Sequence, residues 1–247
     1  MTRLLVLTFL TACWTLAGAD HRPDFRKGGW AALLNGRDLH GWTVSGSKGN
    51  TWFTTAKVAL AADPKRLAAI AESGGIMVNG PDGRTSNFLT ARKFGDVELY
   101  VEFLVASKSN SGVYLQGLYE VQVFDSHGVA SPGVHDCGAI YERWIDGKGV
   151  GGSAPRQNAS RPPGEWQSFH IWFRAPRFDS SGTKTENARF LKVLHNGILV
   201  QENVEVDGPT RASMTYAEGV ELPLMLQGDH GPVAYRNLWL RKLTSPR

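Results

Sequence analysis

The clearest pattern in the chain is an alternation of apolar and polar residues between positions 109 and 128. Successive side chains of a strand point to opposite faces, so the segment predicts two strands joined at a turn around Gly117. The apolar face consists of Val113, Leu115, Val121 and Val123. The other face carries Tyr114, Gln116, Glu120 and Gln122, and we expect water to reach it. Groups that donate and accept hydrogen bonds suit a sugar-binding sheet, although an ordinary exposed sheet can carry them as well.

Similar short runs recur along the rest of the chain. The longest covers residues 97–105, where every second residue is apolar, and Asn196-Gly197 is a strong hairpin turn between two further runs. Strands are also expected at 33–34, from 42 onward, and at 52–60, 75–79, 87–91, 138–144, 166–174, 188–194, 197–206, 222–226 and 234–243. This spacing, with Gly, Pro and Asn at the turns, predicts an all-β sandwich or barrel.

Two segments depart from the strand pattern. Asp63-Pro64 followed by KRLAAIAE has the N-cap and first-turn residues of a short helix, so we expect one helical insertion over about 65–72. Residues 126–164 are irregular and rich in Gly and Pro, and a long insertion of this kind is often functional. No repeat or linker divides the chain, so residues 20–247 are predicted to form a single domain.

The first 19 residues look like an export signal. Arg3 precedes a short apolar run, and Ala17-Gly18-Ala19 is a small-x-small cleavage site. We therefore expect an exported protein, periplasmic or secreted, of bacterial type. An alternative is lipid anchoring through Cys13, because Leu-Thr-Ala-Cys resembles a lipobox. After cleavage only Cys137 remains, which excludes an internal disulfide and indicates a small buried side chain.

Composition narrows the classes of partner. The net charge of the 247-residue chain is +4, and Lys and Arg do not cluster, so we expect no nucleic-acid partner. No apolar run outside the N-terminus approaches the length of a membrane span.

Candidate chemistry comes from polar groups at strand ends and in loops. Asp125 ends the second strand of the opening segment, and Gln227, Asp229 and His230 precede the last strand, where an adjacent His and Asp can form an acid–base pair or an ordinary loop. Tyr141, Trp144 and Asn158 lie in the irregular region. Glu98 and Glu102 share one strand face, but a solvated edge explains them better.

Metal and nucleotide motifs are poorly represented. The histidines form no HxH or HExxH pattern, although His127, His135 and Asp136 could converge in the irregular region. No phosphate loop and no GxSxG elbow is present. The sequence thus assigns no ligands for a metal, and a divalent metal ion is kept as a candidate cofactor.

Three motifs occur in order along the chain: NSGVYLQGLYEVQ, PPGEWQ and LQGDHG. In this combination the sequence resembles the bacterial 3-keto-disaccharide hydrolase family, also described as 3-keto-glucoside 1,2-lyase/3-keto-2-hydroxy-glucal hydratase domains. The resemblance runs from about Gly29 to Leu243. It implies a jelly-roll β-sandwich of the concanavalin-A-like lectin/glucanase type, with a sheet that cradles sugar.

The resemblance also implies a reaction. A ketone at C3 of a sugar acidifies the hydrogen at C2, so a base can remove it and the group at C1 can leave. Water then adds to the resulting 2-hydroxy-glucal, and the net result is hydrolysis. This route needs a base near C2, an electrophile or metal on the ketone oxygen, and an acid near the leaving oxygen.

Roles for the candidate residues follow as hypotheses. Glu120 or His230 is the base, with Asp125 and Asp229 as partners. The expected sugar contacts are Asn110, Tyr114, Gln116, Gln122, Tyr141, Trp144, Asn158 and Gln227.

Two rivals remain on the same fold. A non-catalytic carbohydrate-binding module would need aromatic and amide groups but no titratable pair. An ordinary glycan hydrolase would need two carboxylates on one strand face, and the strand of Glu120 offers one.

Overall fold

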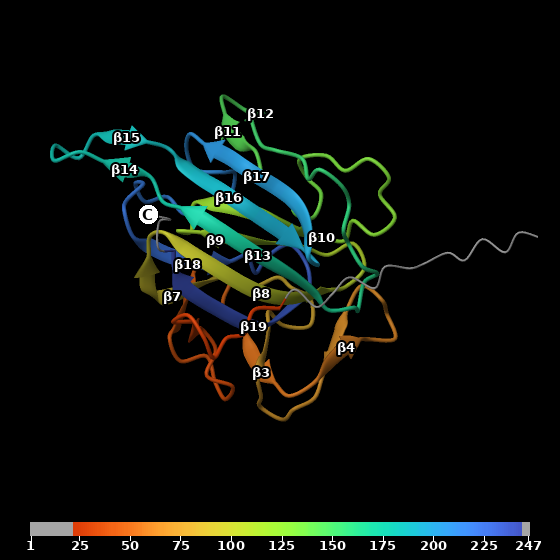
Figure 1. The fold of residues 1–247 in the computed structure, drawn as a ribbon. Helices are drawn as coiled ribbons and strands as arrows, with labels where there is room; N and C mark the ends of the chain where they lie inside the picture. Colours follow the sequence, from red (N-terminus) through yellow and green to blue (C-terminus); the bar gives the residue numbers. More distant parts are fainter. Residues whose placement is uncertain (1–21, 244–247) are drawn as a thin grey trace, which may run out of the picture.

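The computed structural model describes residues 22–243, and within this range the protein consists of strands and loops without a helix. The predicted export signal and Cys13 lie outside the described residues. Two large antiparallel sheets pack face to face, and three two-stranded hairpins decorate them (Figure 1). Within the described part of the chain, no helix is long and apolar enough to cross a membrane.

The larger sheet has eight strands and faces the viewer in Figure 1. Its order is β17 (Ile198–Val206), β16 (Ala188–His195), β13 (Gln167–Arg174), β8 (Val97–Val105), β19 (Val233–Lys242), β6 (Ile76–Val78) and β3 (Phe53–Thr55), with β1 (Ala31–Ala32) also paired to β19. The smaller sheet has five strands in the order β10 (Tyr119–Phe124), β9 (Asn110–Leu115), β18 (Leu222–Leu226), β7 (Asn87–Phe94) and β2 (Trp42–Ser45). The all-β jelly-roll sandwich expected from the sequence is thereby confirmed.

One apolar core lies between the sheets. The alternate residues of β8 point into it, as do the apolar residues of β9 and β10. Phe103 of β8 is fully buried, and its ring centroid lies 4.6 Å from that of Phe169 on the neighbouring strand β13. Cys137 is also fully buried and unpaired, as expected from its apolar neighbours.

Truncating the centre of this core is expected to destabilise the protein strongly. Phe103→Ala removes a buried ring and leaves a cavity, which should lower the free energy of unfolding by about 3–5 kcal/mol. Val44→Ala, at an exposed position of β2, is the matched control and should change it by less than about 0.5 kcal/mol. Urea denaturation measures both values, and equal effects would contradict the assignment of Phe103 to the core.

The predicted helical insertion is wrong, because this segment forms a hairpin of β4 (Val58–Leu60) and β5 (Leu67–Ala69). The amide of Lys65 donates to the Asp63 carboxylate at 3.0 Å, so Asp63 closes a turn instead of capping a helix. A helix of eight residues gains few internal hydrogen bonds, whereas pairing with β4 buries Leu67 against a small apolar cluster. The other two hairpins are β11 (Arg143–Ile145) with β12 (Lys148–Val150), and β14 (Arg177–Phe178) with β15 (Lys184–Glu186).

The opening segment forms the predicted hairpin of β9 and β10, and Gln116 and Gly117 both take positive φ in its turn. Its polar face, however, is not wet: the four side chains on it are only 0% to 3% exposed. Two loop regions bond to the hairpin and cover it. Tyr141 donates its amide to the Glu120 carbonyl at 3.1 Å, and Thr210 donates its amide to the Leu118 carbonyl at 2.9 Å.

Glu98 and Glu102 also differ from their expected solvated edge, since both are buried on the outer face of the larger sheet. Glu98 contacts His170 at 2.8 Å and accepts from Arg241 at 2.7 Å. Glu102 accepts from Arg236 at 2.6 Å. These carboxylates therefore form ion pairs that connect β8 to its neighbouring strands. They lie in the larger sheet, whereas the polar face of the hairpin belongs to the smaller one.

Candidate active site

A cavity of about 220 Å³ lies over the polar face of the β9–β10 hairpin, on the side of the small sheet that faces away from the core. Its lining residues are Asn110, Tyr114, Glu120, Gln122, Tyr141, Arg211, Ala212, Gln227 and His230. Seven of these nine residues belong to the set expected from the sequence. The cavity has a buried floor with Glu120 at its base and an exposed rim that includes His230 and Arg211.

Glu120 projects from β10 opposite Tyr114 of β9, and its carboxyl group lies over Gly112. Burial raises the pKa of this carboxyl to about 8, because little water is left to solvate its charge, and a hydrogen bond with Tyr114 offsets only part of the rise. The Tyr114 hydroxyl in turn donates to the Arg211 carbonyl at 3.1 Å. Glu120 is therefore mainly protonated at neutral pH and is positioned as a proton donor.

Gly112 makes room for this carboxyl group. A Cβ at position 112 would lie 2.2 Å from Glu120 Oε1 and 2.7 Å from the Tyr114 ring. The N-S-G motif therefore needs a glycine at its third position because a larger side chain would collide with Glu120 and Tyr114. The backbone there has no positive φ and continues the strand.

We expect Gly112→Ala to impair activity more than stability, because the added methyl group displaces the Glu120 carboxyl group from the cavity floor. A misplaced reacting group costs on the order of 100-fold in kcat. Gly75→Ala is the control, since a Cβ there meets no atom within 4 Å. Steady-state kinetics on the two purified variants provide the measurement, and equal activities would rule out this packing role.

His230 forms a pair with Asp229 on the rim. Asp229 Oδ1 lies 2.5 Å from His230 Nδ1, and Lys48 Nζ donates to Asp229 Oδ2 at 2.6 Å. Burial acts to raise the pKa of Asp229, but the hydrogen bonds and charges of His230 and Lys48 outweigh it and hold the pKa at about 2. An ionised carboxylate only accepts hydrogen bonds, so the shared proton belongs to Nδ1, and Nε2 is the ring nitrogen outside this contact.

Close backbone contacts fix the loop that carries this pair. Asn79 donates its side-chain amide to the carbonyls of Gly228 and Gly231, at 3.0 and 2.8 Å. A Cβ at Gly228 would lie 2.4 Å from the Ser86 carbonyl, and one at Gly231 would lie 2.5 Å from the Ser109 hydroxyl. The glycines of LQGDHG thus let the loop lie against the sheet, which holds His230 at the cavity.

Three amide side chains on the wall present unused acceptors. The side-chain oxygens of Asn110, Gln122 and Gln227 are buried without a hydrogen-bond partner in the described structure. The Gln122 amide nitrogen donates to the His135 carbonyl at 3.2 Å, which fixes its oxygen as the free end. Buried polar atoms without partners are rare in proteins, and three of them occur together on the residues of this cavity.

Tyr141 and Arg211 complete the wall. Burial, with smaller contributions from Glu120 and Glu142, raises the pKa of Tyr141, so its phenol stays protonated. Arg211 and Ala212 were missed from the sequence, because residues 207–221 show no strand pattern. The positive φ of 60° at Ala212, rare for a residue with a Cβ, is visible only in the structure.

Four predicted site residues and Asp229 do not line the cavity themselves. Gln116 donates its amide to the carbonyls of Phe94, Gly219 and Val220 at the far end of the hairpin. Asp125 accepts from the Lys108 amide at 2.9 Å. Asn158 donates to the Ser126 and Val129 carbonyls, which orders the irregular loop. Trp144 lies behind Arg211, whose Cζ is 3.8 Å from the ring centroid.

Acidic and histidine side chains do not gather into a metal centre in the part of the chain that the structure describes, where no group of three or more His, Cys, Asp or Glu could hold an ion. His135 pairs with Glu142 at 3.4 Å, and Asp136 bonds to Ser126 at 2.7 Å.

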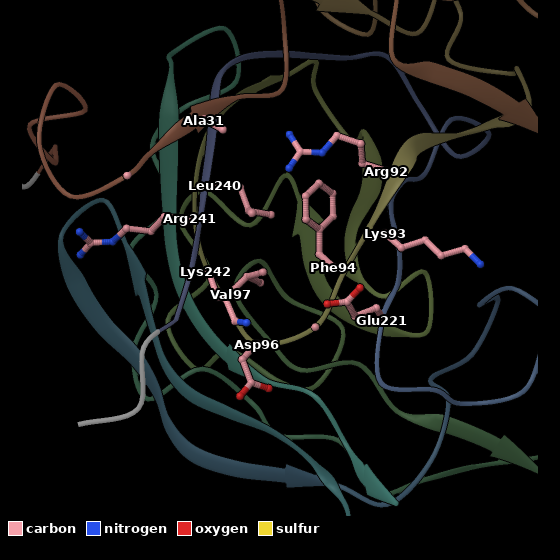
Figure 2. A pocket seen from close by; sticks show the side chains of 12 residues that line it. Ala31, Arg92, Lys93, Phe94, Asp96, Val97, Glu221, Leu240, Arg241 and Lys242 are labelled. Carbon is pink, nitrogen blue, oxygen red and sulfur yellow. The ribbon is translucent and has the colours of Figure 1, made fainter. Parts of the chain in front are cut away.

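A second, larger cavity of about 440 Å³ lies at the turn between β7 and β8, beside the end of β19. Figure 2 shows Arg92, Phe94 and Leu240 gathered around its middle. Asp96 on its wall accepts two bonds from Arg177, and Arg241 is held by Glu98. Asp96 and Arg241 are therefore held by structural ion pairs, and polar residues of the motifs NSGVYLQGLYEVQ and LQGDHG line the first cavity and not this one.

Comparison with known proteins assigns the family. The model of the 3-keto-alpha-glucoside-1,2-lyase-like domain matches residues 29–241, which is most of the chain. The chain belongs to this family. The resemblance read from the three sequence motifs is therefore confirmed. A comparison with curated proteins found no match.

Solved structures agree with this assignment. A crystal structure of a predicted glycosyl hydrolase from Parabacteroides distasonis is 26% identical, covers 87% of this chain and 84% of its own, and has a TM-score of 0.63. A second such protein from the same organism, 20% identical over 87% of this chain and 100% of its own, has a TM-score of 0.55 and supports the fold. Family and structure together place this 3-keto-alpha-glucoside-1,2-lyase-like domain among carbohydrate-processing lyases and hydrolases.

Proposed function

We propose that the protein cleaves the glycosidic bond of 3-keto-glycosides, such as 3-keto-disaccharides, by elimination followed by hydration. The observation that carries this proposal is that the buried Glu120 carboxyl group and the His230 imidazole, which is bonded to Asp229, line one cavity. Glu120 keeps its proton because burial raises its pKa to about 8, whereas the low pKa of Asp229 keeps that group ionised, so it orients His230 through Nδ1. Groups whose environments separate their protonation states are suited to acid and base roles.

The elimination uses both groups. His230 Nε2 removes the proton at C2, which the neighbouring ketone has acidified, and the electrons of that bond pass into an enolate. The enolate collapses to a C1=C2 double bond as the bond from C1 to the leaving oxygen breaks. Glu120 donates its proton to that oxygen, so the products are an alcohol and a 3-keto-2-hydroxy-glucal. His230 is then cationic beside Asp229, and Glu120 is a carboxylate.

The hydration restores the starting state. Glu120 accepts a proton from a water molecule as that water adds to C1. His230 returns its proton to C2, and the product is the free 3-keto sugar. No other proton donor is needed, because each residue regains in the second step the state that it had before the first.

The amide oxygens of Asn110, Gln122 and Gln227 accept hydrogen bonds from sugar hydroxyls in this proposal.

We also propose that the protein is exported to the periplasm or the medium, as predicted from residues 1–19. N-terminal sequencing of the mature chain tests it: a first residue of Asp20 supports simple cleavage, and an intact Met1 would contradict export.

Incubating the purified protein with a 3-keto-disaccharide and with its unoxidised parent tests the activity, and parallel samples with a chelator show whether a metal is required. Release of free sugar from the keto substrate alone is expected. Binding of either sugar without turnover of either would favour a non-catalytic carbohydrate-binding module and overturn the proposal. Turnover of the parent sugar at an equal rate would favour an ordinary glycan hydrolase.

A further inference from the structure

The elimination requires a positive or hydrogen-bonding group at the ketone oxygen, and the cavity holds one that the acid and base do not use. We propose that Arg211 binds the C3 oxygen and stabilises the enolate that forms when the C2 proton leaves. This inference rests on the proposed function, because it assigns a role within the same reaction.

The first observation is charge. Most arginines of the described chain pair with a carboxylate; Arg143, in the neighbouring β11, pairs with Asp207 at 2.9 Å. Arg211 lines the cavity, and the guanidinium group has no carboxylate partner within residues 22–243. A cation without a counterion is suited to receive negative charge, and it attracts that charge more strongly once a sugar excludes water from the rim.

The acidic groups nearby do not cancel this charge. Glu120 carries its proton below a pH of about 8, as its raised pKa requires. The Asp229 carboxylate is already bonded to Lys48 and His230, and Glu142 contacts His135 at 3.4 Å. The wall of the cavity therefore has an excess of positive charge before the reaction starts, and the enolate neutralises it.

The second observation is that Arg211 is held in place from three sides. Its Cζ lies 3.8 Å from the centroid of the Trp144 ring, which is a close cation–π contact. Its amide donates to the Glu142 carbonyl at 2.8 Å, and its carbonyl accepts from the Tyr114 hydroxyl at 3.1 Å. The left-handed backbone of Ala212 follows directly, and strain of this kind is concentrated at functional sites.

The same contacts connect the oxygen site to the acid. Tyr114 bonds to both the Glu120 carboxyl group and the Arg211 carbonyl, so it links the two residues across the cavity floor. Tyr141 lines the same wall, and the charge of Arg211 acts to lower the pKa of its phenol. A phenol and a guanidinium group on one wall form a site for an oxyanion rather than for an alcohol.

Arg211→Gln tests the proposal. Loss of an oxyanion donor is expected to lower kcat by roughly 100- to 1,000-fold. KM should change little, because the enolate exists only during the reaction. Exchange of the C2 hydrogen of the keto sugar in deuterated water, followed by NMR, should slow by the same factor. Added guanidinium ion should raise the kcat of Arg211→Ala and leave the wild type unchanged.

Arg92→Gln is the matched control, since Arg92 also lies over an aromatic ring, that of Phe94, but in the other cavity. It should retain wild-type kcat and exchange. A higher KM for Arg211→Gln with unchanged kcat and exchange would overturn the proposal, because Arg211 would then bind the ground state. A wild-type protein that neither cleaves nor exchanges the keto sugar would overturn the proposed function and this role together.

Discussion

Replacing His230 with glutamine is expected to reduce kcat by about 100- to 10,000-fold, which is the usual contribution of a general base. Glutamine can still donate a hydrogen bond to Asp229, so the loop should keep its place, but an amide cannot accept the C2 proton. Exchange of the C2 hydrogen in deuterated water should be lost to the same extent as cleavage. This pairing of losses identifies the residue that removes the proton.

His127→Gln is the control, because His127 is exposed and does not line the cavity. Asp229→Asn should have a smaller effect than His230→Gln, since it leaves the imidazole in place and removes only the charge that orients it. If His230→Gln exchanges the C2 hydrogen as fast as the wild type, the base is another residue, and Glu120 would be the next to test.

Glu120→Gln is expected to lower kcat by about 100-fold or more, because glutamine cannot transfer a proton to the leaving oxygen. The pH profile should change as well. The wild type needs Glu120 protonated, so its kcat/KM should fall tenfold per pH unit above the pKa of about 8. The residual activity of the variant should lack this decline. A wild-type rate that rises through this pH range would show that Glu120 acts as a base.

The same substitution should stabilise the fold at alkaline pH. The pKa of Glu120 is raised from its ordinary 4.5 to about 8, so between these values the folded state binds a proton that the unfolded state has released. Stability therefore falls as pH rises through this window and is lowest above it. At about pH 9, Glu120→Gln should exceed the wild type by on the order of 3–5 kcal/mol in free energy of unfolding.

Urea denaturation at about pH 4 and pH 9 measures this difference, and the two proteins should be nearly equal at the lower pH. Glu72→Gln, at an exposed position, is the control and should show no dependence of this kind. Loss of activity without the gain at high pH would mean that the Glu120 carboxyl group is better solvated than its burial implies.

Local patterns in the sequence were sufficient for most of the fold. The alternation in residues 97–105 and the turn at Asn196-Gly197 follow from strand geometry alone, and both occur as expected, in β8 and between β16 and β17. The predicted helix at 65–72 was wrong because this segment pairs with β4 and buries Leu67 in a small apolar cluster, which local propensity does not reveal. The expectation of a solvated edge at Glu98 and Glu102 was wrong for the same reason. Their partners, Arg241 and Arg236, lie on a strand more than a hundred residues away in the sequence.

The candidate site was predictable where a strand face or a compact motif marked it. Glu120 and Gln122 share a face by parity, and Asp229-His230 stand together in LQGDHG. Arg211 carried no such signal, because its place depends on contacts with Trp144 and Tyr114. The alternation of residues also predicted which side chains of β10 share the polar face, but not which loops cover that face. From the sequence alone, the floor of the cavity was therefore expected to be open to solvent.

The segment that covers β10 has a consequence for the evolution and redesign of the site. β10 ends the small sheet, and its free side is bonded by the backbone at 138–141, where Gly138 donates to Gln122 at 2.8 Å and Tyr141 donates to Glu120 at 3.1 Å. An uncovered edge strand invites pairing between molecules and aggregation. The loop that supplies Tyr141 therefore also protects solubility, so a variant with a wider cavity should exchange side chains there and keep the backbone at full length.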